Sequence, residues 1–139
     1  MEKKKQVVVY VDGYNFYYGL KKGGARWKRH YWLDVVKFFE RMMLPDQELV
    51  EVFTKRCDIT IIVSADSDMI PSVEIIKGLD PKHPVHIFVP PTQNSYALAS
   101  KCDHVVWLEH YKARFVQSML PDKVTLANGH IVQRPDNWY

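Results

Sequence analysis

Apolar residues form short continuous runs that alternate with stretches of helical spacing. Residues 6–11 (QVVVYV) and 59–63 (ITIIV) are runs rich in β-branched side chains, and residues 85–89 and 104–108 are runs of the same kind. A run that is apolar throughout is typical of a strand buried on both faces, as in a parallel sheet. Residues 48–54 alternate well enough to predict one more strand.

The stretches between these strands predict helices. Asp34 is a plausible N-cap, Pro71 is tolerated in a first helical turn, and Asn94 can cap another helix. In chain order we expect helices over residues 16–20, from Asp34 to just before Pro45, over 69–79, over 94–102 and after 108.

Strands that alternate with helices predict an α/β fold with an open, mostly parallel sheet. The chain has 139 residues, of which 47% are hydrophobic, so we expect one domain over 1–139. Residues 120–139 form a C-terminal tail extension with little pattern, apart from a hairpin expected around Asn128-Gly129.

One connection does not fit the parallel pattern. Only Lys55, Arg56 and Cys57 separate the second predicted strand from the third, whereas parallel neighbours need a crossover of about a dozen residues. Either the two strands form an antiparallel hairpin, or a segment between Arg56 and Cys57 is missing from this sequence. We favour the second explanation, because these residues do not form a tight hairpin turn.

Composition narrows the class of protein. The net charge of +3 and the pI of about 8.8 are compatible with a polyanionic partner. The two cysteines and six histidines show no zinc or catalytic-triad spacing, which favours a reducing, cytoplasmic setting. No apolar run approaches the length of a membrane span, so we expect no membrane partner.

Acidic residues directly follow two of the predicted buried strands. Asp12 comes after the first, and Asp66 and Asp68 come after the third. The carboxyl ends of parallel strands lie at one edge of a sheet, where α/β proteins bind ligands. Carboxylates are preferred Mg²⁺ ligands, and a bound cation offsets their mutual repulsion. The three aspartates together therefore predict a metal site, although each alone is better explained by a turn or a helix cap.

Polar residues around these motifs are candidate substrate ligands. Asn15 either takes a left-handed turn conformation or orients phosphate and metal-bound water, and both interpretations stay open. Ser64 and Ser67 can donate to phosphate, although a tight strand-to-helix turn also needs small residues. Asn94 and Ser95 follow the fourth strand at the same sheet edge.

Basic and aromatic residues alternate over residues 21–32. Lys28 and Arg29 can contact phosphates while neighbouring rings stack on unpaired bases, as in a nucleic-acid clamp. At least as often such a stretch is a solvated loop that Trp27 or Trp32 anchors in the core. The aromatic end, residues 137–139, can pack onto the body or mediate self-association, which leaves a homo-oligomer open.

Residues 8–19 (VVYVDGYNFYYG) and 62–71 (IVSADSDMIP) resemble the two signature segments of NYN domains, the LabA-like group of the PIN-like nuclease superfamily. Shorter similarities cover most of the chain, at residues 32–34, 88–91, 95–98, 102–103, 120–122 and 134–135.

The resemblance implies a three-layer α/β/α sandwich, a Mg²⁺- or Mn²⁺-dependent acidic site and cleavage of RNA. Asp12, Asn15, Asp66 and Asp68 occupy the site positions of that family. The group usually carries a helix with a further acidic site residue between the second and third strands, where this sequence is too short.

The sequence therefore predicts a metal-dependent endoribonuclease that acts on single-stranded or structured RNA. The main alternative is a non-catalytic RNA-binding or regulatory module with the same fold. A phosphatase is disfavoured because Tyr14 stands where its second aspartate is needed. A nucleotide-sugar transferase is disfavoured because the domain is small and its DxD motif is paired with DGYN.

Overall fold

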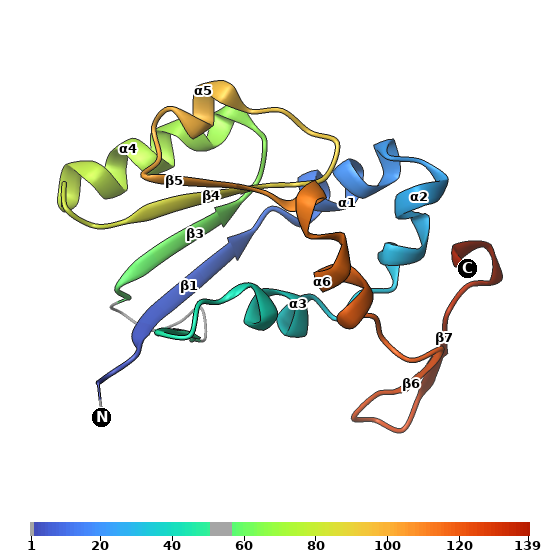
Figure 1. Ribbon diagram of the computed structural model, residues 1–139. Coiled ribbons are helices and arrows are strands. Elements are labelled where there is room, and N and C mark those ends of the chain that lie inside the picture. The colour runs from blue at the N-terminus through green and yellow to red at the C-terminus, as the bar shows by residue number, and fades with distance from the viewer. Residues whose placement is uncertain (1, 51–56) are drawn as a thin grey trace.

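The structure, a computed structural model, describes residues 2–50 and 57–139. Within these ranges, five strands form one fully parallel sheet in the order β2-β1-β3-β4-β5 (Figure 1). The strands are β1 (Lys5–Val11), β2 (Gln47–Leu49), β3 (Ile59–Val63), β4 (Val85–Val89) and β5 (His104–Trp107).

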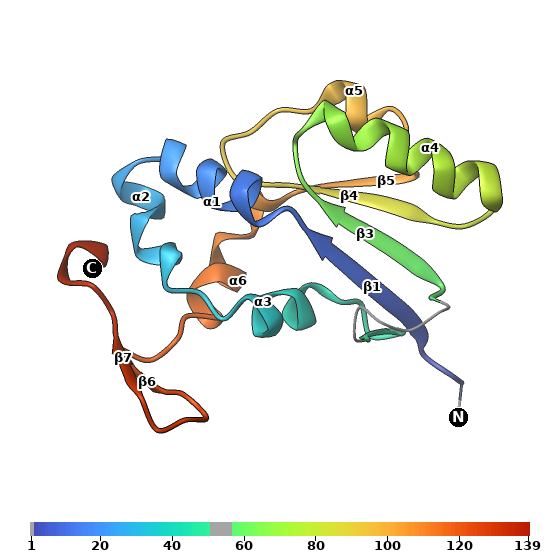
Figure 2. The same cartoon turned by 180° about the vertical axis from the view of Figure 1, so that it is seen from behind.

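Helices cover both faces of the sheet, so the fold is a three-layer α/β/α sandwich (Figure 1 and Figure 2). One face packs against α1 (Gly13–Lys22), α2 (Ala25–Lys28), α3 (Val35–Met42) and α6 (Lys112–Gln117). The other packs against α4 (Ile70–Leu79) and α5 (Tyr96–Ala99). Short 3-10 turns complete the order: η1 (Arg29–Tyr31), η2 (Ser67–Met69), η3 (Leu108–Tyr111) and η4 (Asp136–Trp138).

Most predicted elements are confirmed, and the caps explain several boundaries. The side chain of Asp34 accepts a hydrogen bond from the backbone N–H of Lys37 at the start of α3, as expected. The helix predicted over 94–102 is shorter, because α5 begins after Ser95 and ends at Ala99. Asn94 as its cap is therefore wrong. Residues 101 and 102 continue with tighter bonds to carbonyls three residues back.

The second and third strands do not form a hairpin. Both pair with β1 in parallel, on its opposite sides, so the antiparallel alternative is wrong. The described part of the predicted strand 48–54 pairs only up to Leu49, which lies beside Val7. Residues 51–56, and with them the boundary where a missing segment was expected, lie outside the described residues and leave that expectation a prediction.

The C-terminal tail folds back onto the body. Strands β6 (Lys123–Thr125) and β7 (Ile131–Gln133) form the predicted antiparallel hairpin around Asn128-Gly129. Beyond it, the ring of Trp138 lies edge-on to that of Tyr31, with centroids 5.4 Å apart. Of the two interpretations of the aromatic end, the structure shows packing onto the body. Among the described residues, no helix is long and apolar enough to cross a membrane.

An aromatic cluster forms the centre of the layer that contains α1, α3 and α6. Phe115 is fully buried, and its ring lies 4.3 Å from that of Phe38 and 5.2 Å from that of Trp27. His30 is enclosed in the same cluster, with none of its surface exposed. Burial, and then the neighbouring cations of Lys112, Arg29 and Arg134, lower the pKa of His30 from 6.5 to about 4.

We predict that His30 makes the protein less stable in mild acid. Because the pKa of His30 is lower in the folded state than in the unfolded state, the unfolded chain binds a proton that the folded chain does not. The folded state keeps its full stability above pH 6.5 and loses it as the pH falls towards 4. The free energy of unfolding should fall over this window by up to about 3 kcal/mol from this group. Urea titrations at several pH values should show a shallower pH dependence for His30→Phe than for the wild type. The exposed His110→Gln is the control, and an unchanged slope in His30→Phe would contradict the prediction.

Candidate functional site

The loops that carry the two acidic motifs leave neighbouring strands at the same edge of the sheet. In the pairing of β1 with β3, Val11 lies beside Val63, so Asp12 and Ser64 start their loops side by side. The backbone N–H of Asp12 donates to the carbonyl of Val63, at 3.0 Å, and extends the ladder by one bond. The topology thus brings the motifs together, as the sequence predicted.

Asp12 caps helix α1 and is tied to the second motif. Its Oδ1 accepts a hydrogen bond from the backbone N–H of Asn15 at 3.0 Å, which is N-cap geometry. Its Oδ2 accepts from the hydroxyl of Ser64 at 3.2 Å. The half-buried carboxylate is therefore held in a defined position by both loops, and each oxygen keeps a further lone pair for a ligand.

Asn15 joins the two motifs from the other side. Its side-chain Oδ1 accepts a hydrogen bond from the backbone N–H of Ala65 at 2.8 Å. It lies in the first turn of α1. Among the described residues, Thr92 is the one non-glycine residue with a positive φ, so the left-handed turn interpretation of Asn15 is wrong. The amide instead holds the Ser64–Asp68 loop against α1.

Ser64 connects the aspartates rather than facing solvent. Its side chain is fully buried, donates to Asp12 and accepts from the backbone N–H of Asp66 at 3.0 Å. Since its single hydroxyl proton is used within the protein, Ser64 positions the site in this conformation and does not serve as a phosphate donor.

Asp66 precedes η2 and Asp68 lies within it, and both are exposed. The Oδ1 atom of Asp66 accepts from the backbone N–H of Asp68 at 2.9 Å, so Asp66 is the cap of this turn. The side chains of Asp68 and Ser67 are exposed beside it. Of these two aspartates, Asp66 is the one that caps, and Asp68 presents its carboxylate to solvent.

The three aspartates do not form a preassembled metal centre. Within residues 2–50 and 57–139, no group of three or more His, Cys, Asp or Glu side chains is arranged to hold a metal ion. Magnesium sites commonly use one or two carboxylates, with water and substrate phosphate completing the coordination. A cation at this edge would therefore rest on fewer protein ligands than the sequence predicted.

The loop after β4 packs against α1, a contact that the sequence analysis did not predict. Thr92, at φ 63°, donates its hydroxyl to the carbonyl of Gly19 at 2.7 Å. A Cβ at Gly19 would lie 2.7 Å from the carbonyl oxygen of Pro91, so glycine permits this close packing. A glycine inside a helical stretch was the available signal. Of the predicted ligands in this loop, Asn94 is exposed and Ser95 is buried.

The two tryptophans of the basic stretch over residues 21–32 pack against the protein and are not free to stack on bases. Trp27 is buried in the core, with Lys112 Nζ 5.7 Å from its ring centre, and Trp32 donates its indole N–H to the carbonyl of Pro121 at 2.8 Å. The anchoring interpretation is confirmed for Trp27, whose ring cannot stack on bases. Lys28 is half-buried and Arg29 is exposed.

Exposed tyrosines were missed as candidate ligands. Tyr14 and Tyr18 lie one helical turn apart on α1, 79% and 46% exposed, with nearly parallel rings whose centres are 6.0 Å apart. Both follow Asp12 directly on the helix that it caps. The i, i+4 spacing was visible in the sequence, but the solvent-facing side of this helix was not.

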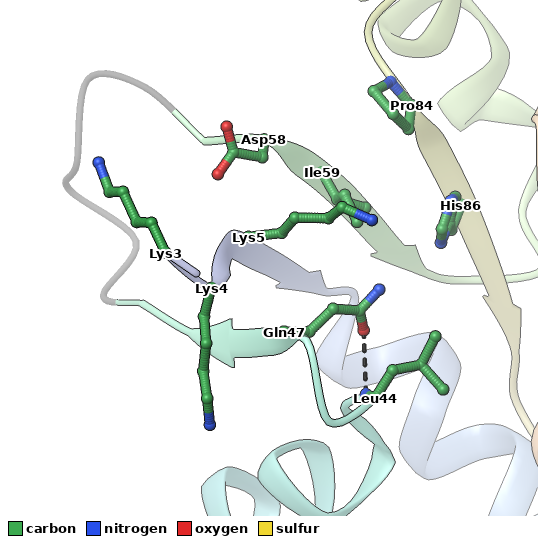
Figure 3. A pocket seen from close by; sticks show the side chains of 9 residues that line it. All are labelled: Lys3, Lys4, Lys5, Leu44, Gln47, Asp58, Ile59, Pro84 and His86. Carbon is green, nitrogen blue, oxygen red and sulfur yellow. Dashed lines mark hydrogen bonds between the residues drawn. The ribbon is translucent and has the colours of Figure 1, made fainter. Parts of the chain in front are cut away.

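The amino-terminal edge of the sheet carries an ion pair and a pocket lined by several lysines. Asp103 lies there, directly before β5, and its Oδ2 accepts a hydrogen bond from the backbone N–H of Val85. A hydrogen bond from Lys77, and then that from Val85, lower the pKa of Asp103. A pocket of about 640 Å³ opens at the same edge, and its side chains are drawn in Figure 3. It is remote from the acidic motifs, which follow the opposite ends of the strands.

We predict that the bridge from Asn15 stabilises the site. Asn15→Ala leaves the backbone N–H of Ala65 without its partner in a partly buried position, so the free energy of unfolding should fall by about 1–2 kcal/mol. Urea denaturation measures this change. The exposed Asn94→Ala should stay within about 0.5 kcal/mol of the wild type. Equal stability of the two variants would show that the bridge does not hold the loops.

No family model matches the chain, and no curated protein matches it. Among solved structures, a protein of unknown function from Vibrio parahaemolyticus is similar, with a TM-score of 0.53 and 16% sequence identity. The match covers 76% of this chain and 94% of the other. At this identity the likeness concerns the fold alone.

Proposed function

We propose that the chain is a metal-dependent endoribonuclease that cleaves single-stranded RNA at the carboxyl edge of its sheet. The observation that carries this proposal is the hydrogen-bonded chain from Asp12 through Ser64 to Asp66, which joins the two acidic motifs. It holds carboxylates at the edge where parallel α/β sheets bind ligands. The NYN-like motifs, which contain the same residues, support the same function.

The residues of the site divide into oxygen donors and positioning residues. Asp12 and Asp66 would offer carboxylate oxygens to Mg²⁺ or Mn²⁺, which when bound supplies an activated water and stabilises charge on the phosphoryl group, and the exposed Asp68 would orient water. Asn15 and Ser64 keep the two loops in register. This division explains why the polar residues at the edge are tied together while Asp68 stays open to solvent.

The surroundings suit an unpaired RNA strand. The stacked pair Tyr14 and Tyr18 offers exposed rings to bases next to Asp12. Ser67 and Asn94 are exposed polar groups in the adjoining loops, and Arg29 adds a cation further along. We place this activity in the cytoplasm, since both cysteines are free thiols. The partner that we propose is RNA and not a membrane.

A second candidate is a non-catalytic RNA-binding or regulatory module. It is favoured by one observation, that the described residues hold no group of three metal ligands. Such a module would use the same tyrosines and cations to bind RNA without cleaving it.

Cleavage of a labelled single-stranded RNA in Mn²⁺ or Mg²⁺ separates the two candidates. We expect metal-dependent cleavage by the wild type, and a loss of about a hundredfold or more in Asp12→Asn, because that residue is held at the centre of the site. The exposed Asp136→Asn, on the tail, is the matched control and should cleave normally. Binding of RNA with no cleavage in either metal would establish the module, and cleavage that survives in Asp12→Asn would remove the site from the reaction.

The tyrosine pair should carry part of the RNA affinity. Tyr14→Ala should weaken binding of a single-stranded oligonucleotide by about tenfold, as expected for one lost base–ring stack. Fluorescence anisotropy in the presence of EDTA measures binding without cleavage. Tyr111→Ala, at an exposed tyrosine that belongs to η3 and not to the α1 pair, is the control. An equal loss in both variants, or none in Tyr14→Ala, would refute a stacking role for the pair.

A further inference from the structure

Unsatisfied polar atoms gather in one corner of the molecule. Within the described residues, the buried side-chain nitrogens and oxygens that lack a hydrogen-bond partner are Nδ1 and Nε2 of His30, Oγ of Ser118 and Nε of Arg134. All belong to the region where the segment around η1 meets the chain after α6 and the tail. There, Leu33 bridges to Met119.

His30 is the unusual member of this group. Its side chain is fully buried, and the rings of Trp27 and Phe115 lie 5.5 Å from its own. Buried polar groups are nearly always hydrogen-bonded, since an unpaired one costs the free energy of its lost hydration. A neutral imidazole carries one donor and one acceptor, and here both are unused.

A pocket of about 410 Å³, which is within the size range of small-ligand sites, lies beside the buried His30. It is lined by Arg29, His30, Val116, Met119, Arg134 and Tyr139. The lining thus combines two guanidinium groups and an unpaired imidazole with an apolar wall, and contains no carboxylate side chain.

The two arginines are presented differently. Arg29 is exposed at the rim, where its guanidinium can meet an incoming anion. Arg134 is held in place: Nη2 donates to the carbonyl of Trp138, Nη1 lies 3.6 Å from Oδ1 of Asp122, and its guanidinium lies over the ring of Tyr139. Its Nε remains without a partner. One fixed and one exposed guanidinium at the same pocket make a site for oxygen anions.

We propose that this pocket binds a nucleotide, with its phosphate group on Arg29 and Arg134, next to the buried His30, and its base on the apolar wall. The proposal goes beyond the acidic edge, because the pocket is lined by residues of η1, α6 and the tail and by none of the acidic motifs. The same chemistry fits a free nucleotide and the terminal nucleotide of an RNA strand.

The charge state of His30 agrees with this assignment. Because burial and the cations of Lys112, Arg29 and Arg134 lower its pKa, the imidazole is neutral near pH 7 and leaves the positive charge of the pocket to the arginines. Asp122, paired with Arg134, is the acidic group that the structure places at this cation.

The test is a titration of the full chain, labelled with ¹⁵N-histidine, with adenosine monophosphate in EDTA. We expect saturable shifts of the His30 signals, which His30→Gln assigns, with inorganic phosphate competing and adenosine binding more weakly. Arg29→Gln should weaken binding by about tenfold, because it removes a charged hydrogen-bond donor at an exposed position where folding is unaffected. Arg114→Gln, exposed on the neighbouring α6 and outside the lining, is the matched control.

A second pair of probes identifies the source of the nucleotide. A short RNA with a 5′-phosphate that binds better than its unphosphorylated form assigns the pocket to an RNA end, whereas binding of the mononucleotide alone assigns it to a free nucleotide. Unshifted His30 signals, equal binding of adenosine, or unchanged affinity in Arg29→Gln would overturn the proposal. Since no metal and no cleavage are involved, this result is independent of the ribonuclease assay.

Discussion

Parallel pairing of β1 with β3 is the constraint on which the site depends. The register that sets Val11 beside Val63 forces both strands to end together, and the two loops that follow begin one hydrogen bond apart. Because a parallel sheet directs the carboxyl ends of its strands to one edge, two motifs separated by some fifty residues meet there through strand pairing alone. The flanking helices then hold this sheet between two apolar layers, so that the edge is rigid where the loops depart.

Structural and functional interpretations of the acidic motifs are compatible. Asp12 caps a helix and Asp66 caps a turn, which are the structural roles that the sequence offered for single aspartates. The same bonds leave lone pairs on both carboxylates and fix where they point, which is the condition for binding a cation or a phosphate partner with precision. Ser64 was predicted to donate to phosphate, but its side chain is fully buried and connects Asp12 to Asp66 by hydrogen bonds.

The aromatic layer has a second consequence at the other end of α1. Phe115 and Trp27 enclose His30, and the tail packs back over η1 through Trp138. Residues from three distant parts of the chain thereby surround a polar ring that has no partner. The tail therefore completes a pocket instead of merely extending the domain.

The sequence by itself determined most of the strands and the edge at which the acidic motifs lie. Residues 59–63 and 85–89 were located to the residue, because strands buried on both faces are apolar throughout, and Asp34 marked its helix because capping is a local interaction. Tertiary structure decided what depends on distant neighbours. It placed β2 and β3 on opposite sides of β1, buried Trp27 and His30, and gave Asn15 its partner. Periodicity reports which face of an element is apolar, whereas partner and burial follow from how the elements pack together.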